Sequence, residues 1–343
     1  MTRLARVQRA AGALALTLSV TLAACSENPT SAPKPEQKAP PSATQAPSRE
    51  PIEPLPTVPA LDRKVVALGR RLFHEPRLSG DGKVSCSSCH DLAKGGVNGR
   101  SLSIGVNGIQ GLVNAPTVYN ASLNFVQFWD GRAATLEEQV GGPITNRFEM
   151  GSSWEKVLSA LRADASLAAD FATLPGGVTE ANVRRALADF ERTLVTHGSP
   201  FDRFLAGDDK ALSAEARAGY EMFKSVGCIA CHQGRNVGGN MFQRFGVLGD
   251  YFKDRGHVSD ADYGRYNVTR NESDRYVFRV PSLRNVALTA PYFHDGSAAT
   301  LTQAVQVMAR YQLGRKLSDE QVQEIIAFLG SLVGEQAPAG AKI

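Results

Sequence analysis

The chain repeats itself, because three segments of its first half recur in the same order in its second half. The longest pair is FWDGRAATL at residues 128–136 and FHDGSAATL at residues 293–301. Two shorter pairs precede it, namely Ala67–Phe73 with Arg217–Phe223 and Asn114–Ala121 with Val280–Ala287. Such self-similarity indicates that one structural unit occurs twice. A chain of 343 residues, 43% of them hydrophobic, has room for a core in each unit.

Each repeat carries one Cys-x-x-Cys-His motif. The residues are Cys86, Cys89 and His90 in the first repeat and Cys228, Cys231 and His232 in the second. In such a motif the two thiols form thioethers with the vinyl groups of a haem, and the histidine ligates the iron. A single motif also suits zinc or redox chemistry, but two copies in one exported chain predict two covalently bound c-type haems.

The N-terminus predicts export. Residues 1–24 combine three arginines with an apolar run that is too short for a good membrane span, which is typical of a signal peptide. The run ends in LAAC, which resembles the lipobox of bacterial lipoproteins and assigns lipidation to Cys25; an ordinary signal peptide with a chance cysteine is the alternative. Residues 25–60 are rich in proline and predict a semi-extended tether. We expect a lipid-anchored periplasmic protein, and Ser26 favours the outer membrane.

Charge and cysteine use agree with this interpretation. Removal of the signal peptide with its three arginines lowers the formal charge from +4 to +1. Because nucleic-acid binding requires a concentrated basic face, no nucleic-acid partner is expected. An exported protein normally pairs its cysteines in disulfides, but here four of the five lie in the two motifs and the fifth is Cys25.

The apolar spacing predicts an all-α fold. Helical periodicity with capping residues at the start is found in Ser152–Ala163, in Thr179–Thr196 and in the segment that begins at Ser318. Two cytochrome c-like helical haem domains in tandem, after a signal peptide and a Pro-rich tether, are the fold that we expect.

The two domains are expected to span residues 61–205 and 206–338, with the folded part starting near Leu61. Trp129 lies in the repeated FWDG segment, where its ring suits an electron relay between haems; an ordinary core position is the alternative. His294 replaces this tryptophan in the second repeat and is expected at the domain interface rather than on an iron.

The sixth ligand of each iron decides between a catalyst and an electron carrier. In the second repeat Met308 is expected to ligate the iron, although methionine is also a common core residue. In the first repeat Glu149 and Met150 stand side by side. If Met150 ligates the iron, the protein only passes electrons. If Glu149 faces the iron, a carboxylate stands over an open site and suits proton transfer to and from peroxide. A surface position for Glu149 is the third alternative.

Across residues 61–332 the sequence resembles the bacterial diheme cytochrome c peroxidase family, which includes the methylamine-utilisation enzyme that matures a tryptophan-derived quinone. The resemblance rests on LFHEPRLSGDGKVSCSSCH, NAPTVYNAS, FWDGRAATLEEQVGGPI, FEMG, GCIACH, YVFRVPSLRNVALTAPYFHDG and VMARYQLG. It implies two cytochrome c-like domains whose haems face a shared interface, with hydrogen peroxide as substrate.

The resemblance also implies a role for each site residue. Glu149 matches the catalytic acid and base beside the haem of His90, and Trp129 matches the inter-haem tryptophan. His232 and Met308 match the ligands of a high-potential haem that receives electrons from a small periplasmic donor, such as cytochrome c or a cupredoxin.

A calcium ion between the domains is implied as well. The matching positions are the side chain of Asn114 and the carbonyl groups of Thr289 and Pro291, and oxygen-only ligation suits a hard cation. A homodimer is compatible with the resemblance.

One departure from the family concerns the first haem. Many members carry a histidine that caps the resting iron, whereas here the matching SIG is followed by Val106 and Asn107. Valine cannot ligate, so the first iron is predicted to be five-coordinate or water-bound at rest and to need little reductive activation. Met308 stands where the maturation enzyme has a tyrosine, which favours reduction of peroxide to water. An electron-transfer diheme lipoprotein and a maturation-type oxidase of a protein or organic substrate are the alternatives.

Overall fold

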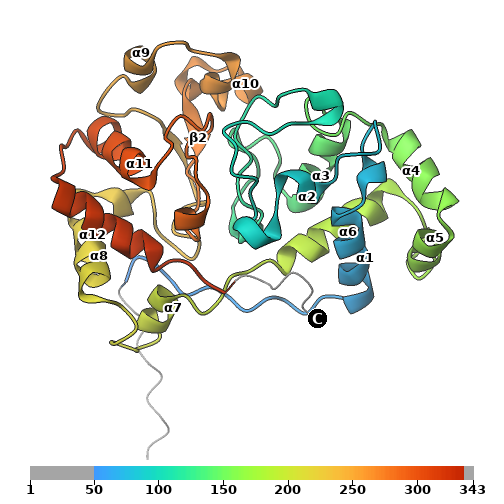
Figure 1. Cartoon of the computed structure of the whole chain (residues 1–343), viewed down its shortest axis with the longest axis horizontal. Coiled ribbons are helices and arrows are strands. Elements are labelled where there is room, and N and C mark those ends of the chain that lie inside the picture. The colour runs from blue at the N-terminus through green and yellow to red at the C-terminus, as the bar shows by residue number, and fades with distance from the viewer. Residues whose placement is uncertain (1–49, 336–343) are drawn as a thin grey trace, which may run out of the picture. The chain divides into compact units, whose positions relative to one another are not determined.

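The computed structural model describes residues 50–335, and Cys25, the signal peptide and most of the tether lie outside them. Figure 1 shows a helix-rich chain. The helices of the first half are α1 (Arg63–Phe73), α2 (Cys86–Cys89), α3 (Leu136–Thr145), α4 (Trp154–Ala163), α5 (Ala165–Phe171) and α6 (Glu180–Arg192). Those of the second half are α7 (Pro200–Leu205), α8 (Ala214–Val226), α9 (Tyr251–Arg255), α10 (Tyr266–Thr269), α11 (Leu301–Val307), the π-helical turn η9 (Met308–Gln312) and α12 (Asp319–Gly330).

Short 3-10 turns fill many of the connections. They are η1 (Pro76–Leu78), η2 (Leu92–Lys94), η3 (Val106–Gly108), η4 (Ala121–Leu123), η5 (Cys228–Ala230), η6 (Asp260–Tyr263), η7 (Glu272–Asp274) and η8 (Val286–Leu288). A two-stranded antiparallel sheet, β1 (Phe242–Arg244) with β2 (Val277–Arg279), pairs Phe242 with Arg279. The described fold is therefore helical apart from this small ribbon.

The predicted helices form, with small differences at their ends. Helix α12 begins after Ser318, whose side chain and that of Gln321 make the predicted capping box. Helix α6 begins after Thr179 and ends at Arg192. Helix α4 is capped by Ser153 instead of Ser152, because the hydroxyl of Ser153 accepts the backbone N–H of Lys156.

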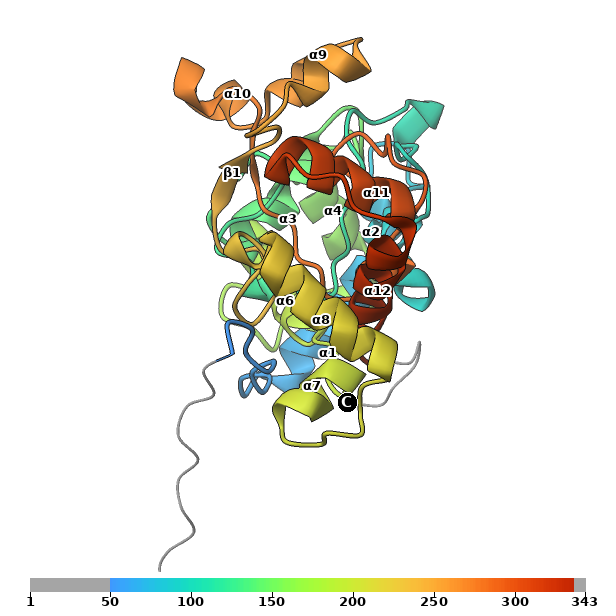
Figure 2. The ribbon, with the colours of Figure 1, turned by 90° about the vertical axis from the view of Figure 1, so that its left-hand side faces the viewer.

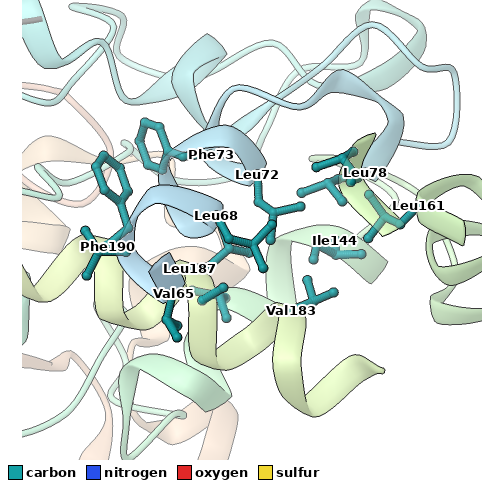
Figure 3. Packing of buried hydrophobic residues seen from close by; sticks show 14 of the residues in the cluster. Val65, Leu68, Leu72, Phe73, Leu78, Ile144, Leu161, Val183, Leu187 and Phe190 are labelled. Carbon is teal, nitrogen blue, oxygen red and sulfur yellow. The ribbon is translucent and has the colours of Figure 1, made fainter. Parts of the chain in front are cut away.

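The first hydrophobic core lies where α1 crosses α6. Figure 3 shows Leu68, Leu72, Leu187 and Phe190 packed between the two helices. Gly69 lies at the contact, and a Cβ atom there would collide with the carbonyl group of Ala186. The close approach of the helices therefore requires glycine at this position.

The second core repeats this arrangement with α8 and α12, which lie side by side in both views (Figures 1 and 2). Gly219 takes the place of Gly69, since a Cβ atom there would collide with the carbonyl group of Glu324. The FWDG and FHDG segments also match in backbone conformation, with positive φ at Phe128 and at Phe293. The duplication that the sequence predicts is thus a duplication of structure.

The folded part starts earlier than expected, which corrects the predicted start near Leu61. Ile52 is fully buried in the second core, although α1, the next helix, belongs to the first. The hydroxyl of Tyr220 donates to Glu50 at 2.6 Å, and the guanidinium of Arg284 donates to the carbonyl oxygen of Glu53 at 3.1 Å. This part of the predicted tether is therefore folded against the second half.

A buried hydrogen-bond cluster joins the two halves. The side-chain amides of Asn120 and Asn285 both donate to the hydroxyl of Thr196, at 2.9 and 3.0 Å. The two asparagines are equivalent positions of the repeat, and both have left-handed backbone. The hydroxyl of Thr196, in the segment after α6, thus links the two halves by hydrogen bonds. Helix α7 follows this segment and packs in the second core through Phe201.

Candidate haem sites

The first Cys-x-x-Cys-His motif forms α2 and the residue after it. Ser85 and Ser88 close this short helix with a capping box, and both thiols are free and half-buried. Nδ1 of His90 lies 3.2 Å from the carbonyl oxygen of Gly96. A proton on Nδ1 then points at that carbonyl and leaves Nε2 available to a metal. Burial lowers the pKa of His90, which favours the neutral form that ligates. A covalently attached haem fits these groups.

The second motif opens into a cavity of about 230 Å³. The four residues predicted to hold the second haem all line it: Cys228, Cys231, His232 and Met308. Most of the other lining residues are apolar, which suits a porphyrin. Burial lowers the pKa of His232 to about 4, so the ring is neutral at physiological pH. Met308 begins the π-helical turn η9, a type of turn that is frequent at functional sites. A haem fits this donor set.

Trp129 comes from the first half but lines the cavity of the second. Its indole N–H donates to the carbonyl oxygen of Asn114 at 2.9 Å, and its own carbonyl accepts the backbone N–H of Arg279 at 2.8 Å. Its ring packs beside an aromatic cluster made by Tyr251, Phe252, Phe278 and Tyr311. The tryptophan is therefore held from both halves, next to the second site.

Glu149 follows α3 and lies near the first motif. The amide of Asn146 donates to Oε1 of Glu149 at 2.6 Å. Burial raises the pKa of Glu149, and the hydrogen bond from Asn146 and the charge of Arg132 oppose part of this rise. The carboxylate is close enough to Cys86 and Cys89 for its charge to contribute to the raised pKa values of both thiols. The structure thus brings a proton-holding carboxyl group to the first motif.

Met150 lies elsewhere, although it is the next residue. Its side chain is 3% exposed and belongs to the first hydrophobic core. Its backbone is fixed as well, because its N–H donates to Pro143 and its carbonyl accepts the N–H of Gly80. The thioether therefore serves packing, and this placement favours Glu149 over Met150 as the residue that faces the first haem.

Val106 is buried in the loop that follows the first motif. Its backbone N–H donates to the carbonyl oxygen of Glu149 at 2.8 Å, and its side chain packs against Gly151. The next residue, Asn107, has left-handed backbone. This loop thus supports the backbone of Glu149.

His294 lies at the junction of the two halves, as predicted. Its Nε2 atom is 2.7 Å from Oδ1 of Asp262, its ring stacks on Phe278, and its carbonyl accepts the N–H of Asn114. Ligand atoms of Asp262, His294 and Asp295 lie within 4.8 Å of one another. The guanidinium of Arg255 pairs with both carboxylates of this cluster.

The residues predicted to bind calcium line the cavity of the second motif. They are Asn114, Thr289 and Pro291. The amide of Asn114 donates to the carbonyl groups of Arg100 and Ser101, at 3.0 and 3.3 Å, and thereby fixes the side chain. The donor set offers only oxygen, which fits a hard cation.

Arg279 is a site residue that was not singled out from the sequence. It lines the cavity of the second motif and is 3% exposed. It stands in the apolar stretch YVFRVPS, where a lone cation marks an unusual position. That signal was present, but its meaning depends on which way the strand faces.

Within residues 50–335, the structure has no helix with the length and apolar character that crossing a membrane requires.

Comparisons with known proteins identify the family of the chain. The family model for Di-haem cytochrome c peroxidase matches residues 63–210. The Cytochrome c peroxidase Ccp of Escherichia coli (strain K12) is 48% identical over 84% of this chain and 62% of its own length. Cytochrome c551 peroxidase of Nitrosomonas europaea is 46% identical over 84% of this chain and 86% of its own length. This chain thus spans less than two thirds of the Escherichia coli relative.

Solved structures show the same fold. A MauG-like protein associated with microbial copper homeostasis has a TM-score of 0.72 at 28% identity, over 86% of this chain and 97% of that one. The diheme peroxidase BthA from Burkholderia thailandensis has a TM-score of 0.67 at 20% identity, over 81% and 87%, and supports the fold alone. With relatives of this identity and coverage, the chain belongs to the di-haem cytochrome c peroxidase family.

Proposed function

We propose that the protein is a diheme c-type peroxidase that reduces hydrogen peroxide to two waters, with two protons and with two electrons from a small donor such as a cytochrome c or a cupredoxin. When bound, the two haems supply the redox chemistry. The observation that carries the proposal is the opposite placement of Glu149 and Met150: the carboxyl group lies beside the first motif, and the thioether is in the core.

Individual residues of the chain have separate roles in the proposed reaction. Glu149, with its raised pKa, takes a proton from one oxygen of peroxide and returns it to the other. Asn146 orients the carboxyl group through its 2.6 Å hydrogen bond. Trp129, which comes from the first half and lines the second site, would carry electrons between the two sites. His232 and Met308 hold the second haem, which accepts electrons from the donor.

The decisive variant is Glu149→Gln, which keeps the shape and the hydrogen bond acceptor but cannot ionise. Turnover of peroxide with a reduced cytochrome donor should fall by about 100-fold or more, the usual effect of losing a general acid–base, while both haems stay attached. Glu155→Gln, at an exposed carboxyl on α4, is the matched control. Near-normal turnover of the Glu149 variant would contradict the role.

The first iron is proposed to lack a protein ligand on its distal side at rest. This rests on Val106, whose side chain is buried against Gly151 and offers no donor atom. Ferric electron paramagnetic resonance of the isolated protein should contain a high-spin signal from one haem. Spectra in which both haems are low-spin would argue against the open site and for an electron-transfer protein.

A calcium ion is proposed at Asn114, Thr289 and Pro291, supported by their common cavity. Calorimetric titration of the chelator-treated protein should detect one calcium ion per chain, and Asn114→Ala should weaken its binding. Equal binding by both forms would place the ion elsewhere.

Export, lipidation of Cys25 and attachment to the outer membrane from the periplasm are also proposed, on the signal sequence alone. Mass spectrometry of the mature N-terminus and membrane fractionation of a Cys25→Ala variant test them, since loss of the lipid should release the protein. A homodimer is proposed from the family resemblance, and light scattering of the purified protein would reveal it.

A further inference from the structure

Arg279 is a buried cation of the second haem cavity. Among residues 50–335, Arg244 and Arg279 are the two arginines or lysines that line this cavity, and no aspartate or glutamate does. Arg244 is exposed, whereas Arg279 is 3% exposed. Burial lowers the pKa of Arg279 to about 10, which still leaves the guanidinium charged at neutral pH. A buried cation thus lines a cavity whose other residues are mostly apolar.

Part of this guanidinium lacks a partner. The backbone N–H of Arg279 donates to the carbonyl of Trp129 at 2.8 Å, and its Nε donates to the carbonyl of Phe128 at 3.2 Å. Nη1 is fully buried and makes no hydrogen bond within residues 50–335. None of the ion pairs of this part of the chain involves Arg279. A buried charge without a counter-ion costs several kcal/mol, so the cavity calls for an anion here.

The repeat makes the position informative. Because Asn120 is equivalent to Asn285, and Phe128 to Phe293, the residue equivalent to Arg279 in the first half is Asn114. The cation is therefore absent from the first unit and is not needed for the shared fold. Arg279 is therefore a feature of the second site that the first site lacks.

We propose that Arg279 binds a propionate carboxylate of the second haem through its Nη atoms and ties that haem to the Phe128–Trp129 segment. This inference rests on the proposed binding of a haem by Cys228, Cys231, His232 and Met308. A guanidinium matches a carboxylate with two parallel hydrogen bonds. Its Nε and backbone N–H remain on the two carbonyls, so one residue contacts both the haem and the electron relay.

A positive charge at this place has an electrochemical consequence. It stabilises the reduced iron, which carries one positive charge fewer than the oxidised iron, and it compensates the propionate charge. Arg279 therefore raises the reduction potential of the second haem. It acts as a positioning residue for Trp129, since it touches the tryptophan only through the backbone.

Spectroelectrochemical titration of the purified diheme protein tests the proposal without peroxide turnover. In Arg279→Gln the potential of the second haem should shift downward, and that of the first should stay close to wild type. Arg265→Gln is the matched control: Nη1 of Arg265 donates to the carbonyl of Asp130 in the same segment, but the residue does not line the cavity. Its two potentials should be unchanged.

An Arg279→Gln protein with both haems attached and an unchanged second potential would overturn the proposal. If the glutamine variant does not retain its haem, Arg279→Lys replaces it, because the charge is kept. The lysine variant should hold a potential near wild type but show shifted propionate bands in resonance Raman spectra, since an ammonium cannot form the paired hydrogen bonds. Unchanged propionate bands in the lysine variant would also overturn the proposal. A protein that binds two haems without peroxidase activity still gives these readouts, so the two proposals fail separately.

Discussion

At the scale of single residues, proton affinity at Glu149 is set by one neighbour that can be removed. The amide of Asn146 donates to the carboxylate and so favours the ionised form. Asn146→Ala should raise the already elevated pKa of Glu149 further. Because the ionised carboxylate accepts the proton of peroxide, the acid limb of the pH profile of kcat/KM should move to higher pH.

This prediction is checked by measuring kcat/KM for peroxide across the pH range in Asn146→Ala and in Asn182→Ala. Asn182 is a suitable control, because its amide donates to the backbone carbonyls of Pro175 and Gly177 at the start of α6 and not to a carboxylate. An acid limb that stays in place, or that moves to lower pH, would show that Asn146 does not hold the ionised form.

Residue identity alone did not decide between Glu149 and Met150. The two follow each other in FEMG, and the side chain of either could face the iron of the first haem. The decision comes from the turn after α3, where Asn146 accepts the N–H groups of both Glu149 and Gly151 through its own carbonyl. That turn directs successive side chains to different surroundings. Such geometry depends on contacts between distant segments, as with Gly80 and Met150, and no local pattern reports it.

At the scale of secondary-structure elements, α6 presents one face to α1 and another to the first haem motif. Glu191 lies on the second face, 6% exposed, near enough to Cys86 to contribute to the raised pKa of that thiol. Within residues 50–335 its carboxyl group makes no ion pair. Burial raises the pKa of Glu191 to about 8, against the opposing effect of Arg192. The helix therefore contains a carboxyl group that folding keeps protonated.

Glu191→Gln should stabilise the protein increasingly as pH rises. The unfolded carboxyl ionises above its ordinary pKa of 4.5, whereas the folded one keeps its proton up to about 8. Between these values the wild type loses at most about 1.4 kcal/mol of stability per pH unit, and the glutamine variant avoids this loss. The Tm difference between the two should grow from about pH 5 to about pH 8. A Tm difference that stays constant between pH 5 and pH 8 would disprove the raised pKa of Glu191.

Helices were the most predictable elements. Ser318, Thr179 and the apolar spacing after them mark the starts of α12 and α6, because capping and periodicity are local. The two-stranded ribbon and the network of Asp262 with Arg255 were not predicted. Both depend on pairing between segments that no spacing relates, such as Phe242 with Arg279.

At the scale of the whole described structure, the chain crosses between its two halves more often than a tandem arrangement requires. Ile52, before α1, fills the second core. Ile52→Ala should cost about 2–5 kcal/mol, as is usual for a buried large aliphatic residue. Thermal or denaturant unfolding of the diheme protein measures this loss, and Pro54→Ala, at an exposed position, provides the control. A loss as small as that of the control would mean that the segment contributes no stability.

The family and the duplication were predictable at this scale, because repeated motifs persist in order along the chain. The packing of residues 50–53 against the second half could not be predicted, because their proline-rich composition resembles that of a free linker. The burial of Ile52 and the ion pair between Glu53 and Arg235 are among the contacts that distinguish this folded segment from a free linker.

The hydroxyl of Thr196, shared by Asn120 and Asn285, has a consequence for the two copies taken separately. Each asparagine belongs to one copy of the ancestral unit, and a single oxygen atom serves both. Because Thr196 lies in the first half, separating the copies would leave Asn120 with this partner and would take it from Asn285. The second copy thus depends on the first for a buried hydrogen bond, and we expect it to be less stable when it is expressed alone.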